Sequence, residues 1–137
     1  MSLFRKPMPS SGHPGDDKLL ATLASRSDLE VPRHWVHYSY FGDEHHARAA
    51  ADAITAAGWQ VQRVEAAKRG ERSWIVVADA QAVTSPASVR EARQFFEGVA
   101  ATHGAGEYDG WEAAAPAPRP PRWLQRPQVL RRRRSPR

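Results

Sequence analysis

Hydrophobic and polar residues follow two different periods along this chain, and the periods predict where helices and strands form. The first helical spacing lies at residues 18–26, where Leu19, Leu20 and Leu23 share one face and two acids precede them, as suits a helix N-terminus. Residues 34–41 are rich in aromatic and β-branched side chains, which predicts a strand. A short helix followed by a strand is therefore expected.

Strict alternation within residues 34–41 divides the side chains of this strand between two faces. The alternation alone does not show which face of the strand packs against the core. It also fits a strand whose two faces are both partly covered. One face carries Val36, Tyr38 and Tyr40, and the other carries Trp35, His37, Ser39 and Phe41.

Two longer helices are predicted from apolar residues spaced by three and four. The first begins after Asp43, which suits the N-cap, and ends at Gly58. The second begins with Ser85 as N-cap and Pro86 in its first turn, and it ends at Gly104. The buried stripe of the second helix is expected to comprise Val89, Ala92, Phe96, Val99, Ala100 and His103, whereas Arg90, Glu91, Arg93 and Glu97 are expected to point away.

Three further strands are predicted between and after these helices. Residues 59–65 and 73–79 flank a polar turn at 68–72, so they are expected to pair as an antiparallel hairpin. The apolar composition of 73–79 favours a central place in the sheet. Residues 104–112 look like the last strand, and the Asp109-Gly110 step within them permits a bend or bulge.

The order β-α-β-β-α-β, preceded by a short N-terminal helix, predicts an α+β protein. It matches the ferredoxin-like α/β sandwich, in which two helices cover one face of an antiparallel sheet. Many unrelated activities share this fold, so the fold does not define the function.

Charge is distributed unevenly along the 137 residues. The formal net charge is +5, but residues 116–137 hold eight arginines and no acid. Residues 1–115 therefore carry twelve basic residues against fifteen acids, a balance of −3. These shifts in composition predict a flexible N-terminal arm at 1–15, one folded domain at 16–115, and a disordered proline- and arginine-rich tail at 116–137.

The composition also bears on compartment and partners. The chain has no cysteine, which excludes disulfides and thiolate metal sites. Its longest strongly apolar run, at residues 74–78, is far too short to span a bilayer. A cytoplasmic protein without a membrane partner is expected.

Candidate catalytic and metal-binding residues do not converge in the sequence. His34 and His37 project to opposite faces of a strand, and His45 and His46 are neighbours on a helix, so neither pair has the spacing of metal ligands. Solvated or partly packed histidines are the better interpretation. No phosphate loop, dinucleotide fingerprint or nucleophile elbow is present. We expect no metal, no cofactor and no catalytic residue, and hence no enzyme.

The acids of the last predicted strand are a further candidate for acid–base chemistry, at Glu107, Asp109 and Glu112. No nucleophile or second polar cluster accompanies them, which favours a solvated sheet edge. The rings of Tyr108 and Trp111 beside Gly110 form either an aromatic plug of the core or a surface that contacts a partner.

The tail is the one segment with a nucleic-acid signal. It holds a run of basic residues with Trp123 upstream, a composition that can contact RNA, DNA or an acidic protein through charge and stacking. A solubilising end is the other interpretation of the same composition. The candidate contact residues are Arg131, Arg132, Arg133 and Arg134.

Three segments together resemble the RraB family, the regulators of ribonuclease E activity. They are residues 34–41 with the acidic helix start that follows, Ala-Ala-Gly-Trp at 56–59, and Gly-Glu-Tyr-Asp-Gly-Trp-Glu at 106–112. The last segment resembles the family's YDGW signature. The likeness covers roughly residues 16–114.

The resemblance implies a ferredoxin-like sandwich and a protein that binds a ribonuclease E-type endonuclease without chemistry of its own. It would modulate, most simply inhibit, RNA processing and decay. The alternative is a nucleic-acid-associated protein that contacts RNA or DNA through its tail. The chain departs from the best-known members after the tryptophan and in its arginine tail. The signature positions, which would pack in the core or contact the partner, are Glu107, Tyr108, Asp109, Gly110 and Trp111.

Overall fold

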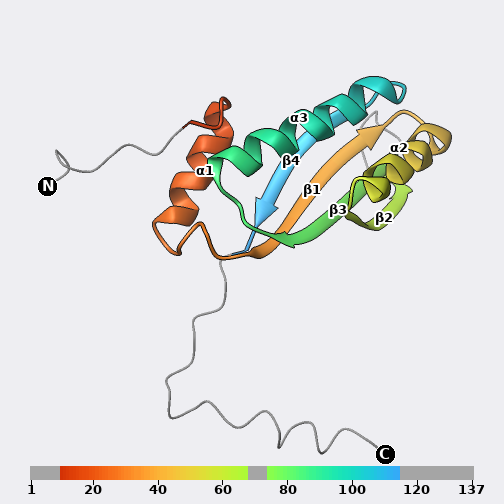
Figure 1. The fold of residues 1–137 in the computed structure, drawn as a ribbon. Coiled ribbons are helices and arrows are strands. Elements are labelled where there is room, and N and C mark those ends of the chain that lie inside the picture. Colours follow the sequence, from red (N-terminus) through yellow and green to blue (C-terminus); the bar gives the residue numbers. More distant parts are fainter. Residues whose placement is uncertain (1–9, 68–73, 115–137) are drawn as a thin grey trace, which may run out of the picture.

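Three helices and four strands follow one another within residues 10–67 and 74–114, the part of the chain that the computed structural model describes (Figure 1). The predicted order of helices and strands is confirmed. The elements are α1 (Pro14–Ala24), β1 (Arg33–Phe41), α2 (Glu44–Ala56), β2 (Gln60–Ala66), β3 (Trp74–Ala82), α3 (Pro86–Thr102) and β4 (Glu107–Ala113).

The strands form one sheet in the order β2-β3-β1-β4, and every neighbouring pair is antiparallel. α2 contacts β2 and β3, whereas α3 contacts β4 and β1, so the two helices lie side by side over the sheet (Figure 1). α1 packs beside α3. The chain is thus an α+β protein with an antiparallel sheet, as predicted, and β3 holds a central place.

The caps predicted for the two long helices are confirmed. The Asp43 side chain accepts a hydrogen bond from the His46 backbone at the start of α2. Ser85 and Ser88 form a reciprocal capping box at the start of α3. Gly58 follows α2 with a φ of +105°, in the left-handed region that favours glycine at a helix end. The predicted turn at 68–72 lies outside the described residues.

The first helix differs from its prediction at both the start and the buried face. It begins at Pro14, two residues inside the stretch expected to form the arm, with His13 as its N-cap. Leu20 and Leu23 are buried as expected, but Leu19 is 43% exposed. The apolar face of this single short helix is narrow, so it accommodates only two of the three leucines.

The face of β1 that meets the helices carries Trp35, His37, Ser39 and Phe41, all of them buried. Val36, Tyr38 and Tyr40 are only half-buried and lie on the opposite face. We call this opposite side of the sheet the open face. No helix of residues 10–67 or 74–114 covers it.

A β-bulge interrupts β4 at the step where the sequence permitted one. Tyr38 pairs with Gly110 and Ser39 with Tyr108, so Asp109 is the extra residue. Gly110 has a φ of +127°, a conformation that L side chains rarely adopt. Because the bulge shifts the alternation by one, Tyr108 and Trp111 both face the core although three positions separate them.

Candidate functional site

Tyr108 and His37 join β4 to β1 inside the core. The Tyr108 hydroxyl and His37 Nδ1 are 2.7 Å apart, and His37 is only 1% exposed. The Tyr108 ring stacks on Phe96 of α3, with ring centroids 5.5 Å apart. His37 stacks on the same phenylalanine at 4.2 Å. His37 is therefore a core residue, and the expectation of a solvated or partly packed histidine is wrong for it.

Burial keeps the His37–Tyr108 pair uncharged. Desolvation lowers the pKa of His37 to about 3 and raises the pKa of Tyr108 above its usual value. His37 Nε2 has no hydrogen-bond partner among the described residues. Two neutral groups in a packed core hold two strands together, and neither is exposed as a general base would need to be.

Trp111 and Arg93 meet on one carboxylate of the first helix. The Trp111 indole donates to Asp16 Oδ1 over 2.9 Å, and the Arg93 guanidinium donates to both carboxylate oxygens over 2.6 and 2.9 Å. The Asp16 side chain is 3% exposed. Burial raises its pKa, but the hydrogen bonds from Arg93 and Trp111 outweigh that effect, and the net pKa lies below the usual value.

This contact corrects the prediction that Arg93 points away from the core. Its side chain is only 16% exposed, and its guanidinium lies 4.9 Å from the centroid of the Tyr108 ring. Arg93 therefore links α1, α3 and β4. The sequence carried no signal for this link, because 77 positions separate Asp16 from Arg93.

The signature residues thus divide into two groups. Tyr108 and Trp111 contact the core, and Gly110 supplies the backbone conformation that places both there. Glu107 and Asp109 are exposed instead. Glu107 lies across from Tyr40 in the register of β1 and β4, and so belongs to the open face.

The open face has an apolar centre with polar pairs around it. Val36, Tyr38 and Tyr40 of β1 lie across from Asp79, Val77 and Ile75 of β3. The Tyr38 hydroxyl donates to Glu112 over 2.8 Å.

Asp79 accepts from His34 over 2.7 Å and from Gln62 over 3.1 Å. Burial raises the pKa of Asp79, yet these hydrogen bonds outweigh it and the net pKa is lowered. Val77 is only 5% exposed, so the accessible apolar area comes from its half-buried neighbours, above all Tyr38 and Tyr40. Half-buried tyrosines rimmed by polar groups are typical of a surface that binds a partner.

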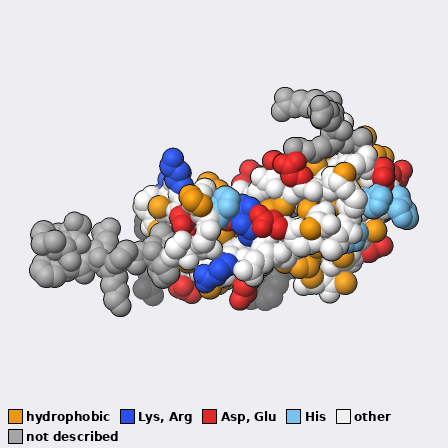
Figure 2. All heavy atoms as spheres, turned by 90° about the horizontal axis from the view of Figure 1, so that it is seen from above, with side chains coloured by type: hydrophobic (Ala, Val, Ile, Leu, Met, Phe, Trp, Pro, Cys, Tyr) orange, Lys and Arg blue, Asp and Glu red, His pale blue; other side chains and the backbone are white. Residues whose placement is uncertain are grey.

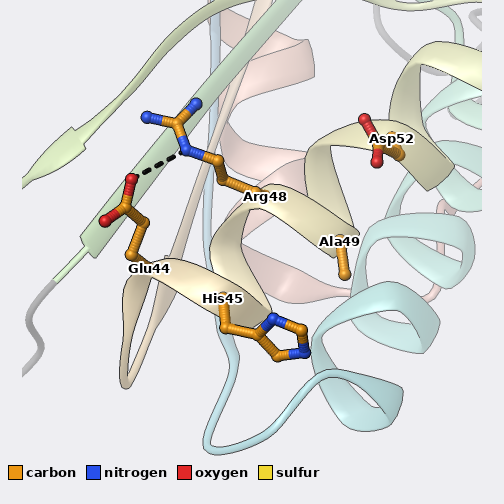
Figure 3. Close-up of a pocket in the computed structure, with 5 residues that line it drawn as sticks. All are labelled: Glu44, His45, Arg48, Ala49 and Asp52. Atoms are coloured by element: carbon orange, nitrogen blue, oxygen red, sulfur yellow. Dashed lines mark hydrogen bonds and ion pairs between the residues drawn. The ribbon is translucent and has the colours of Figure 1, made fainter.

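The outer side of α2 carries a shallow hollow of about 430 Å³ (Figure 3). Arg48 and Glu44 point toward one another there and form an ion pair of 2.9 Å. The other lining residues are His45, Ala49 and Asp52. Figure 2 shows acidic and basic side chains next to one another on the face seen from above, rather than gathered by sign. The hollow on α2 therefore resembles a solvated helix surface more than a binding site, because the charged side chains Arg48 and Glu44 pair with one another there.

The remaining sequence candidates are placed as follows. His34 and His37 lie on opposite faces of β1, as predicted. No group of three metal-ligating side chains occurs in the part of the chain that the structure describes. None of the described helices is long and apolar enough to cross a membrane. Arg131, Arg132, Arg133 and Arg134 lie outside the described residues.

Comparison with known families decides the relationship. A family model described as Regulator of ribonuclease activity B, RraB, matches residues 16–113. The chain belongs to the RraB family. The match runs from α1 to the end of β4 and includes the signature strand. No curated protein matches the chain significantly.

Proposed function

We propose that this RraB-family protein is a non-enzymatic regulator that binds a ribonuclease E-type endonuclease and modulates RNA processing and decay, most simply by inhibition. The proposal rests on the family match over residues 16–113, because the family model is described as a regulator of ribonuclease activity. A cytoplasmic location follows from such a partner.

We infer further that the architecture is the ferredoxin-like sandwich. The strand order β2-β3-β1-β4, antiparallel throughout, and two helices beside one another support this assignment. A sheet covered on one side leaves its second side for a partner. The fold thus explains why a regulator can use a sheet surface without any catalytic group.

The open face is the surface that we propose for the endonuclease. Tyr38 and Tyr40 provide aromatic area at its centre, and tyrosine is enriched in protein interfaces. Glu112, which lies across from Val36, gives its β4 edge a negative charge. A partner segment with basic and apolar side chains complements both features.

The test is affinity purification of the full-length chain beside a version that ends at Ala115, each with and without nuclease treatment. The proposal expects both to retain a ribonuclease E-type enzyme after nuclease treatment, since the surface lies in the folded part. Recovery of RNA alone, lost on truncation, would support the alternative in which the arginine tail contacts nucleic acid.

A further inference from the structure

A cleft of about 390 Å³ opens between the end of α2 and the first half of α3, on the side of the sheet opposite the open face. Trp35 lies in its wall at 2% exposure, whereas Trp59 and Phe95 are half-buried. Its remaining apolar wall is made of small side chains and a valine, which is why the surface is hollow here: Ala57, Gly58, Ala80, Ala82, Val83 and Ala92.

Two polar residues line this cleft, and they differ in their partners. The Ser88 hydroxyl donates to the Val83 carbonyl over 2.8 Å and completes the helix cap, so it is satisfied within the fold. Glu91 is exposed and has no ion pair with any residue that the structure describes. An apolar hollow with one acid fits an aromatic side chain that has a cation beside it.

The end of β4 brings the C-terminal segment of this same chain to the cleft. Ala113 pairs with Trp35, and the Ala114 backbone N–H donates to the His34 carbonyl over 3.1 Å. The chain therefore leaves the sheet beside a residue of the cleft wall.

Nine positions further along lies Trp123, the one aromatic residue of 116–137. Four of the intervening residues are prolines, and a proline-rich spacer of this length reaches about 28 Å at about 3.1 Å per residue. Because the chain leaves the sheet beside Trp35, which lines the cleft, a spacer of this reach is long enough to return Trp123 to the cleft.

Charge also favours the C-terminal tail as the segment that binds in the cleft. Arg122 and Arg126 flank the Trp123-Leu124 pair, and the tail is strongly basic while residues 1–115 carry a net charge of −3. Because the tail is tethered, it samples the cleft at an effective concentration on the order of millimolar. A segment supplied by another molecule has no such advantage.

We propose that residues 122–126 dock in this cleft within the same molecule. Trp123 packs against the rings of Trp59 and Phe95, and a flanking arginine pairs with Glu91. The contact anchors the tail and holds the arginine run at 131–134 next to the folded domain. It lies on the other side of the sheet from the surface proposed for the endonuclease, so the two proposals can fail separately.

The test is nuclear magnetic resonance of the indole N–H groups in the full-length chain, which has five tryptophans. Trp123→Ala should shift the Trp59 indole signal, whereas Leu130→Ala, a matched tail control, should leave it in place. In the unaltered chain the Trp123 indole should exchange its proton about tenfold more slowly than in a free peptide of residues 116–130.

Two substitutions on α3 that each introduce an arginine provide a second test. Glu91→Arg should release the tail and reproduce the effect of Trp123→Ala, whereas Gln94→Arg adds a similar charge to an exposed position outside the cleft and should not. A Trp59 signal that ignores Trp123→Ala would overturn the proposal. A shift that grows with protein concentration would assign the contact to a second copy, and a shift seen only with added RNA would assign it to nucleic acid; either result also overturns it.

Discussion

The Trp111 indole donates a hydrogen bond of 2.9 Å to Asp16, across 95 positions of the chain. Trp111 lies in the strand that resembles the family signature, and Asp16 is the first residue of the family match. The signature strand is thus tied to the first helix through one carboxylate, which Arg93 also holds. The first helix is consequently an integral part of the domain.

Asp16→Asn should destabilise the protein by about 3 kcal/mol, because it removes the buried counter-charge of Arg93 and leaves only the exposed Glu97 beside the guanidinium. Urea unfolding followed by circular dichroism measures this change. Asp52→Asn, an exposed position on α2, is the control and should change stability by less than about 0.5 kcal/mol. Equal effects of the two substitutions would contradict the role given to Asp16.

Stability should fall as the pH drops below about 6.5, because His37 binds a proton in the unfolded chain but not in the folded one until about pH 3. The slope from this group is at most about 1.4 kcal/mol per pH unit. Asp16 acts in the same direction at lower pH, since its folded-state pKa is depressed below 3.8 and its contribution is lost as pH falls.

His37→Gln removes the first of these two contributions. Its stability should change less between pH 6 and pH 4.5 than that of the unaltered protein, as measured by urea unfolding at each pH. The exposed His45→Gln should keep the original slope. A slope that His37→Gln leaves unchanged would show that another group titrates in this range.

Gly110→Ala tests the bulge. A Cβ at Gly110 meets no atom within 4 Å, so the cost comes from its φ of +127° alone, and we expect a loss of about 1–3 kcal/mol. Gly98→Ala is the matched control, because a Cβ there is equally free but sits in the interior of α3. That substitution should stabilise the protein by about 0.5–1 kcal/mol. Thermal unfolding should show a lower melting temperature for Gly110→Ala and a higher one for Gly98→Ala than for the unaltered protein.

Tyr108→Phe should cost about 1 kcal/mol, since it removes the hydroxyl that bonds His37 while the ring stays against Phe96. Tyr40→Phe supplies the comparison on the opposite face of the sheet, outside the core. Denaturant unfolding of both variants measures the difference. A loss confined to Tyr40→Phe would contradict the place given to the signature tyrosine.

Local patterns in the sequence predicted the order of the elements and the caps of the two long helices. Asp43, Ser85 and Gly58 occupy the cap positions expected of them, because a cap depends on residues only a few positions away. The same reasoning failed for Arg93, which sits at a position that looks polar and outward in the helical period. Its partner belongs to another helix, and periodicity within one element carries no information on such a contact.

The bulge shows a second limit of sequence patterns. Tyr108 and Trp111 stand at an odd spacing, which in a regular strand would place them on opposite faces. The extra residue in β4 brings them to one face, and the Asp109-Gly110 step permits such a bulge without requiring it. The pairing of β4 with β1 fixes the position of the bulge, and the bulge places both Tyr108 and Trp111 on the face that packs against the core.

The central proposal is that the open face binds a ribonuclease E-type endonuclease. The most direct measurement titrates the purified full-length chain against that endonuclease and follows both the dissociation constant and the rate of RNA cleavage. Glu112→Lys reverses a charge on the open face, and Asp52→Lys makes the same change on the outer side of α2. We expect Glu112→Lys to weaken binding at least tenfold and to reduce the effect on cleavage, while Asp52→Lys leaves both unchanged. Binding that is absent in the unaltered chain, or that only Asp52→Lys weakens, would contradict the account.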